Sequence, residues 1–152
     1  MAELKPEDQG GVADAILTAI AERTPMEIVG SATMRTIGRP LATPLKLDLS
    51  GLAGLNFYEP EELVLSAKAG TRRSEIDALL QSRRQAFAFE PPDFAHLLGS
   101  NQGGTLGGMI AANLSGPRRI RSGALRDHIL GFSAVSGRGE PFQCLVQINN
   151  LF

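Results

Sequence analysis

Cysteine, net charge and long apolar runs are scarce or missing in this sequence, and each absence excludes a class of protein or partner. The single cysteine, Cys144, rules out an internal disulfide and a metal centre built from several thiolates. Acidic and basic residues almost balance at a formal net charge of -1, so charge alone predicts no nucleic-acid or membrane partner. No apolar run reaches roughly 18 residues, the length that a membrane-spanning helix needs. The charged N-terminus lacks the apolar core of a signal peptide, so we expect a cytoplasmic protein.

Groups that commonly carry catalysis are also sparse. His96 and His128 lie far apart and have no acidic or cysteine companions at metal-ligand spacing, so we expect no metal site. No serine stands in a Gly-x-Ser-x-Gly elbow, and nothing near Cys144 in the sequence predicts a lowered thiol pKa. The catalytic residues therefore stay unassigned, which favours chemistry supplied by a bound cofactor.

Glycine, by contrast, is abundant, with 17 residues, and it clusters in one segment. Gly103, Gly104, Gly107 and Gly108 precede the apolar run 109–114, for which we expect a short buried helix. Such glycines admit a ligand close to the backbone, and successive N–H groups there can converge on an anion. A phosphate-bearing ligand and a tight turn with close helix packing explain the cluster equally well. The spacing matches neither Gly-x-Gly-x-x-Gly nor the Walker sequence.

A second segment of small residues, Gly30-Ser-Ala-Thr33, follows a predicted strand at 26–29. Its backbone N–H groups and the hydroxyls of Ser31 and Thr33 are suited to a phosphate, but this segment taken alone favours a plain surface loop. Four arginines further along match phosphate or carboxylate oxygens as guanidinium forks, or else form a solvated basic loop. These arginines are Arg118, Arg119, Arg121 and Arg126.

Hydrophobic periodicity and turn residues predict a mixture of helices and strands. The predicted helices cover 12–23 and 72–84, and Thr71 is the expected N-cap of the second helix. The predicted strands cover 26–29, 45–49, 63–69, 86–89 and 129–135, followed by a hairpin turn at 136–139 and a second arm that begins near residue 140.

Together these segments resemble the FAD-binding domain of the FAD-linked oxidase family, which has the vanillyl-alcohol-oxidase (PCMH-type) fold. Gly-Pro-Arg-Arg followed by Arg-Asp is characteristic, within that family, of the flavin-binding subunits of glycolate oxidases. The motifs, in the family's order, are Gly30-Ser-Ala-Thr33, Gly38-Arg-Pro40, Tyr58-Glu-Pro-Glu-Glu-Leu-Val-Leu65, Ala69-Gly-Thr71, Phe89-Glu-Pro-Pro92, Gly103-Gly-Thr-Leu-Gly-Gly108, Gly116-Pro-Arg-Arg119, Ser122-Gly123, Arg126-Asp127 and Leu130-Gly131.

The resemblance implies an α+β fold of two lobes, at about 11–70 and 71–142, with FAD between them. Met34 and Arg35 stand where a histidine for covalent flavin attachment would be sought, so the resemblance implies non-covalent FAD. The FAD-binding residues implied by the motifs are Gly30, Ser31, Ala32, Thr33, Pro91, Gly103, Gly104, Thr105, Gly107, Gly108, Gly116, Arg118, Gly123 and Asp127.

The resemblance also implies a function. The complete protein would help to oxidise glycolate, a small 2-hydroxy acid, to glyoxylate, with a second flavoprotein subunit and an iron–sulfur subunit as partners. Its location would be cytoplasmic, or at a membrane through the complex. Two alternatives are a non-catalytic assembly subunit and an FAD-dependent oxidoreductase with another substrate, such as lactate or a cell-wall precursor.

The sequence departs from the family after residue 142. Relatives continue with a second glycine-rich segment, a Lys-Asn-Val-x-Gly-Tyr-Asp-like motif and a substrate or cap domain, none of which is present. The tail 143–152 matches no part of that continuation. We therefore expect an FAD-binding domain at 1–142 that is incomplete at its C-terminal end, as in a fragment or a frameshifted reading frame, and that is inactive alone.

Overall fold

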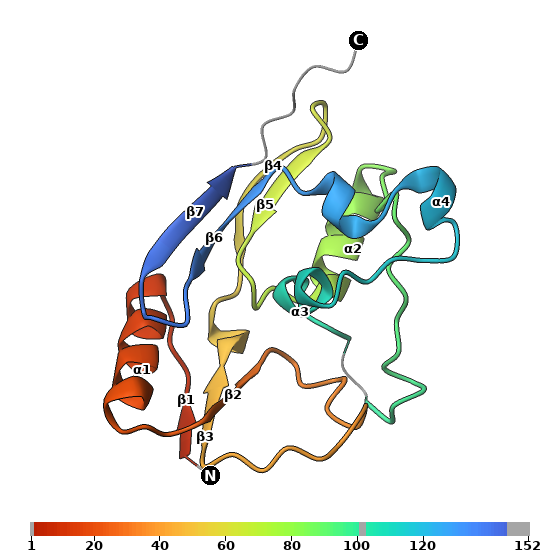
Figure 1. The fold of residues 1–152 in the computed structure, drawn as a ribbon. Coiled ribbons are helices and arrows are strands. Elements are labelled where there is room, and N and C mark those ends of the chain that lie inside the picture. The colour runs from red at the N-terminus through yellow and green to blue at the C-terminus, as the bar shows by residue number, and fades with distance from the viewer. Residues whose placement is uncertain (1, 101–102, 146–152) are drawn as a thin grey trace.

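The computed structural model describes residues 2–100 and 103–145, and its strands form three small sheets (Figure 1). The strands are β1 (Ala2–Leu4), β2 (Met26–Val29), β3 (Leu45–Asp48), β4 (Leu55–Glu59), β5 (Val64–Ala67), β6 (Gly131–Val135) and β7 (Pro141–Leu145). The helices are α1 (Gln9–Ala21), α2 (Arg73–Ser82), α3 (Leu106–Ala111) and α4 (Arg119–Ser122), with 3-10 turns η1 (Leu49–Gly51) and η2 (Leu125–His128).

The first core lies between α1 and a parallel sheet of order β1-β3-β2. Helix α1 starts at Asp8, whose side chain accepts a hydrogen bond of 2.7 Å from the Gly11 N–H. Its buried face, which includes Val12 and Ile16, packs on Leu47 of β3, and Leu47 is only 1% exposed. Because β2 and β3 are parallel and adjacent, the chain must cross between them, and the segment of small residues lies in that crossover.

A second core gathers Phe89, Met109 and Leu125, with Phe87 and Ile129 packed against it. The predicted strand at 86–89 is wrong, because this stretch is irregular. Phe87 and Phe89 nevertheless pack together at a ring-centroid distance of 5.0 Å. The Phe89 carbonyl accepts a hydrogen bond from the Gly116 N–H at 2.9 Å, so a loop supplies a partner that a strand would otherwise supply.

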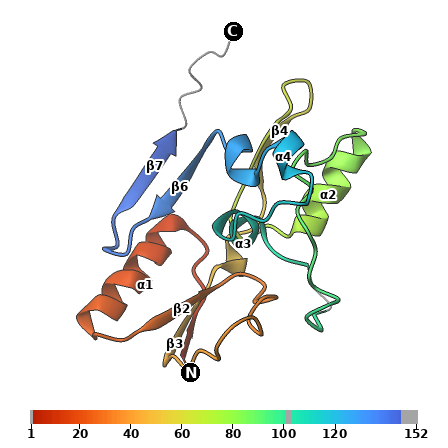
Figure 2. The same cartoon turned by 45° about the vertical axis from the view of Figure 1, so that its right-hand side comes forward.

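Two antiparallel hairpins, β4–β5 and β6–β7, complete the fold. The β6–β7 hairpin is predicted correctly, and it returns to the first core, where Val135 packs and the Gln9 side chain donates to the Ala134 carbonyl. Figures 1 and 2 show this hairpin near the N-terminal turns of α1. The predicted boundary at residue 142 falls inside β7, and residues 146–152 of the predicted tail lie outside the described residues.

The remaining differences from the predicted elements have local causes. Strand β4 is missed because its side chains are mostly exposed and a bulge interrupts its register, so apolar and polar positions do not alternate. Thr71 does not cap α2. Its hydroxyl accepts from the Gly54 N–H and donates to the Gly54 carbonyl, both at 3.0 Å, and α2 begins after Arg72. Helix α3 starts at Leu106, before the predicted 109.

Gly70 provides a test of the close packing between the chain that follows β5 and the 3-10 turn η1. A Cβ at Gly70 would lie 2.3 Å from the Leu49 carbonyl oxygen and 2.9 Å from that of Leu52. Both neighbours are backbone atoms, so Gly70→Ala forces the chain apart and should lower the free energy of unfolding by about 1–3 kcal/mol or more. Urea unfolding measures this loss.

Gly137→Ala is the matched control, because a Cβ there meets nothing within 4 Å. Its unfolding midpoint should stay at that of the unmodified protein. Equal midpoints for the Gly70 and Gly137 variants would contradict the close contact.

Candidate functional site

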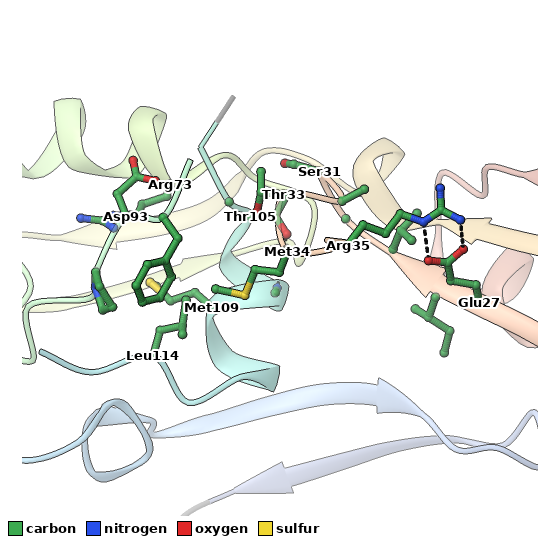
Figure 3. Close-up of a pocket in the computed structure, with 18 residues that line it drawn as sticks. Glu27, Ser31, Thr33, Met34, Arg35, Arg73, Asp93, Thr105, Met109 and Leu114 are labelled. Carbon is green, nitrogen blue, oxygen red and sulfur yellow. Dashed lines mark hydrogen bonds and ion pairs between the residues drawn. The ribbon is translucent and has the colours of Figure 1, made fainter. Parts of the chain in front are cut away.

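Two segments far apart in the sequence meet in a groove (Figure 3). The loop after β2 touches the glycine segment so closely that a Cβ at Gly30 would lie 2.4 Å from Thr105 Oγ1. The groove between them has a volume of about 280 Å³, enough for part of a dinucleotide. The lining residues are Glu27, Ile28, Val29, Gly30, Ser31, Ala32, Thr33, Met34, Arg35, Arg73, Pro92, Asp93, Phe94, Gly104, Thr105, Gly108, Met109 and Leu114.

The first loop, which lines the groove, contains a tight turn at Ala32. Ala32 has φ 54, a left-handed conformation that costs a non-glycine residue about 1–2 kcal/mol. The turn closes with a hydrogen bond from the Arg35 N–H to the Ala32 carbonyl at 3.3 Å. In residues 2–100 and 103–145, the backbone N–H groups of 31–34 and the hydroxyls of Ser31 and Thr33 have no hydrogen-bond partner. They are available to an anionic ligand.

The glycine segment is fixed by its hydrogen bonds to the chain around Thr71. The Arg73 N–H donates to the Gly104 carbonyl at 3.0 Å, and the Leu106 N–H donates to the Thr71 carbonyl at 2.9 Å. Thr105, 3% exposed, caps α3 because its hydroxyl accepts from the Gly108 N–H at 3.3 Å. One wall of the groove is therefore tied to the start of α2.

The glycines in this segment differ in what they do. A Cβ at Gly104 would have no neighbour nearer than Thr33 Oγ1 at 3.9 Å, so space for a ligand atom is open there. A Cβ at Gly107 would lie 2.9 Å from the Ala69 Cβ, and the Gly107 N–H donates to the Ala69 carbonyl at 2.7 Å. Gly104 thus leaves room in the groove, while Gly107 permits close packing.

Ion pairs lie at both ends of the groove. At one end Arg35 donates from Nε and Nη2 to the two carboxylate oxygens of Glu27, both at 2.7 Å. Hydrogen bonding to Glu27 raises the pKa of the Arg35 guanidinium, which stays charged. At the other end Arg73 pairs with Asp77 at 3.1 Å, and Figure 3 shows Arg73 beside Asp93.

The lower wall of the groove is apolar. Met109 and Leu114 line it from α3 and the chain that follows α3, and Phe94 closes it from the loop after Pro92. Met109 is 3% exposed and belongs to the second core, so this wall is continuous with the interior of the protein. The groove therefore joins a polar half to an apolar half.

The structure brings together half of the predicted site residues and places the others elsewhere. The residues that line the groove are Gly30, Ser31, Ala32, Thr33, Gly104, Thr105 and Gly108. The predicted residues that do not line it are Pro91, Gly103, Gly107, Gly116, Arg118, Gly123 and Asp127.

The predicted residues outside the groove make local contacts. Arg118 forms an ion pair with Glu90, with Nε 2.8 Å from Oε2, and this hydrogen bond lowers the pKa of the Glu90 carboxyl. Asp127 accepts a hydrogen bond from the Ala124 N–H at 2.8 Å, next to Gly123 with its φ of 79. A Cβ at Gly116 would lie 2.6 Å from the Glu90 carbonyl oxygen. These contacts shape the segment around the second core.

Several groove residues are absent from the sequence predictions, and Glu27 is the most informative. It is 8% exposed in a strand predicted to be buried, and its partner Arg35 lies eight residues later in the loop. A charged residue at a buried strand position is a sequence signal for a specific partner. The other groove residues without a prediction are Ile28, Val29, Met34, Arg35, Arg73, Pro92, Asp93, Phe94, Met109 and Leu114.

The described residues form neither a metal site nor a membrane-spanning helix. Among the described residues, no three His, Cys, Asp or Glu side chains gather closely enough to hold a metal ion. In the same part of the chain, every helix is too short or too polar to cross a membrane.

Known proteins support the fold and identify the family. A family model described as an FAD binding domain matches residues 2–145. Glycolate oxidase subunit GlcE of Escherichia coli (strain K12) is 39% identical over 122 residues, which are 80% of this chain and 33% of that protein. The chain thus spans about a third of this curated relative's length.

Solved structures share the fold at low sequence identity. An alkyldihydroxyacetonephosphate synthase matches with a TM-score of 0.68 at 16% identity, over 97% of this chain and 27% of the other. Phl p 4.0202, a glucose dehydrogenase, matches with a TM-score of 0.73 at 11% identity, over 93% of this chain and 28% of the other. The predicted α+β fold is confirmed. The chain therefore belongs to the FAD-linked oxidase family, through the FAD-binding domain that this family shares.

Proposed function

We propose that the chain is the FAD-binding part of an oxidoreductase subunit that acts on a small 2-hydroxy acid, with glycolate oxidised to glyoxylate. The observation that carries the proposal is the meeting of Gly30 and Thr105 at one groove, which two loops of phosphate-binding character line. The identity to a glycolate oxidase subunit supports the substrate class. As a subunit of that kind, the protein works with a second flavoprotein and an iron–sulfur partner.

The groove residues fit the diphosphate of FAD. Free N–H groups at 31–34 and the hydroxyls of Ser31 and Thr33 are donors on one side, and Gly104 leaves open space on the other. Donors directed at an anion form hydrogen bonds that are stronger than neutral ones. Two loops held by separate lobes then grip the same group from opposite sides.

The remaining groove residues suit the uncharged parts of the cofactor. Phe94, Met109 and Leu114 form an apolar wall that excludes water from one face of a bound ring. When bound, FAD supplies the hydride acceptor for oxidation of an alcohol carbon. Because Met34 and Arg35 have no side chain that attaches flavin covalently, FAD is held by these contacts alone.

The predicted site residues outside the groove act indirectly in this proposal. Pro91, Gly116, Arg118, Gly123 and Asp127 shape the chain around the second core, which carries the apolar wall. Gly107 keeps the glycine segment close to Ala69, while a Cβ at Gly103 would make only an ordinary contact with Asp93, at 3.8 Å.

Gly104→Asp should abolish FAD retention. The new side chain enters the open space beside Thr33, and its negative charge repels the diphosphate. Flavin absorbance of the purified full chain measures retention. Gly137→Asp makes the same chemical change in the β6–β7 turn, where a Cβ meets nothing within 4 Å, and it should leave retention unchanged. Equal retention by the two variants would remove Gly104 from the site.

Acid precipitation of the flavin-loaded protein should leave all of the flavin in the supernatant, because contacts without a covalent bond are lost when the chain unfolds. Absorbance of supernatant and pellet measures the partition. Flavin that stays with the washed pellet would contradict non-covalent attachment.

Substrate class is tested on the complete protein with its partner subunits. Glycolate should bleach the flavin absorbance under anaerobic conditions, and acetate, which lacks the hydroxyl, should not. If a panel of 2-hydroxy acids leaves the flavin oxidised while another alcohol reduces it, the proposed substrate class is wrong.

A further inference from the structure

A buried acidic residue lies in the same groove as the proposed diphosphate site. Glu27 in β2 is 8% exposed and lines the groove together with Ser31 and Thr33. A carboxylate in a partly dry groove repels a diphosphate, since like charges interact more strongly where water is excluded. The negative charge of Glu27 must therefore be neutralised before an anionic ligand can bind beside it.

Arg35 neutralises Glu27 through a bidentate ion pair. Its Nε and Nη2 each donate to one oxygen of Glu27 at 2.7 Å, so both carboxylate oxygens are engaged. Figure 3 shows the pair at one end of the groove, with Ser31, Thr33 and Thr105 beyond it. The other cation near Glu27 is Lys46, its cross-strand partner, and the Lys46 ammonium is bonded to Glu3 at 2.9 Å. Arg35 is thus the cation that neutralises Glu27.

The same pair fixes the shape of the loop. Glu27 lies in the strand and Arg35 lies eight residues later, so the bond closes the intervening segment at both ends. Between them Ala32 holds its left-handed conformation, and residues 31–34 line the groove. A bidentate guanidinium–carboxylate pair has a defined geometry, so it sets the orientation of this turn as well as its position.

We propose that Glu27 and Arg35 are positioning residues for the diphosphate: Arg35 masks the Glu27 carboxylate and ties the phosphate-binding loop to β2. This inference rests on the proposed function, because it takes the groove as the site of FAD. In this arrangement the two donor groups of Arg35 bind the Glu27 carboxylate, and the loop N–H groups remain to donate to the ligand.

The test is a double-mutant cycle on FAD affinity in the full chain, measured by flavin fluorescence during titration of the apoprotein. Arg35→Ala exposes the Glu27 charge and frees the loop, so FAD should bind about tenfold more weakly or worse. Glu27→Gln removes the charge and keeps the volume, so its loss should be smaller. The double variant should bind FAD better than Arg35→Ala alone, although it carries one more substitution.

Matched controls separate this effect from a general loss of structure. Arg138→Ala removes an exposed arginine in the β6–β7 turn, outside the groove, and FAD affinity should not change. Arg35→Lys keeps the charge with a single contact, so it should recover part of the affinity. Thermal unfolding of each apoprotein shows whether a variant folds. Masking is a charge effect, so it predicts recovery by Glu27→Gln whatever the unfolding temperature.

The outcomes distinguish this inference from the proposed function. Recovery in the double variant supports masking. A double variant no better than Arg35→Ala would show that the Glu27 charge does not weaken FAD binding, so Arg35 does not mask it, and this result would overturn the inference. Unchanged affinity in every Glu27 and Arg35 variant would also overturn it, while sensitivity to Gly104→Asp would keep the groove as the FAD site. If the unmodified chain fails to bind FAD, the proposed function fails and the inference falls with it.

Discussion

The contact between Gly30 and Thr105 is the constraint on which the groove depends. A hydrogen atom is the only side chain that fits at Gly30, because any Cβ would come within 2.4 Å of the Thr105 hydroxyl. Thr105 in turn is held by the hydrogen bond that caps α3 and by a bridge to Arg72. The close approach of Gly30 to Thr105 places the end of β2 against the start of α3, and the groove lies beside this contact.

Close packing and ligand access place opposite demands on the chain, and different glycines meet them. Gly70 and Gly107 let backbone segments approach to distances that no other residue permits: Gly70 packs on the Leu49 and Leu52 carbonyls, and Gly107 packs on Ala69. Gly104 does the opposite, because it leaves space unfilled next to Thr33. The two explanations that the sequence left open for the glycine cluster, close packing and space for a ligand, therefore describe neighbouring residues of the same segment.

Local pattern was sufficient to predict some parts of this fold. The spacing of Val12 and Ile16 predicts α1, and the turn at 136–139 predicts the β6–β7 hairpin. The two small-residue segments identify both walls of the groove. The sequence could not show that the Thr71 hydroxyl bonds to the Gly54 backbone, since Gly54 is seventeen residues away in the sequence. It also could not show the apolar wall, because Phe94 and Met109 look like ordinary core residues until the fold sets them beside the loop.

The central claim is that the two loops hold one diphosphate between them. The most direct measurement is an experimental structure of the FAD-loaded full chain, and the quantity to read is where the two phosphorus atoms lie. The account predicts phosphate oxygens within hydrogen-bond distance of the backbone nitrogens of 31–34 and against the open face of Gly104. A diphosphate bound elsewhere, with the groove between Ser31 and Thr105 filled by water or by protein, would contradict it.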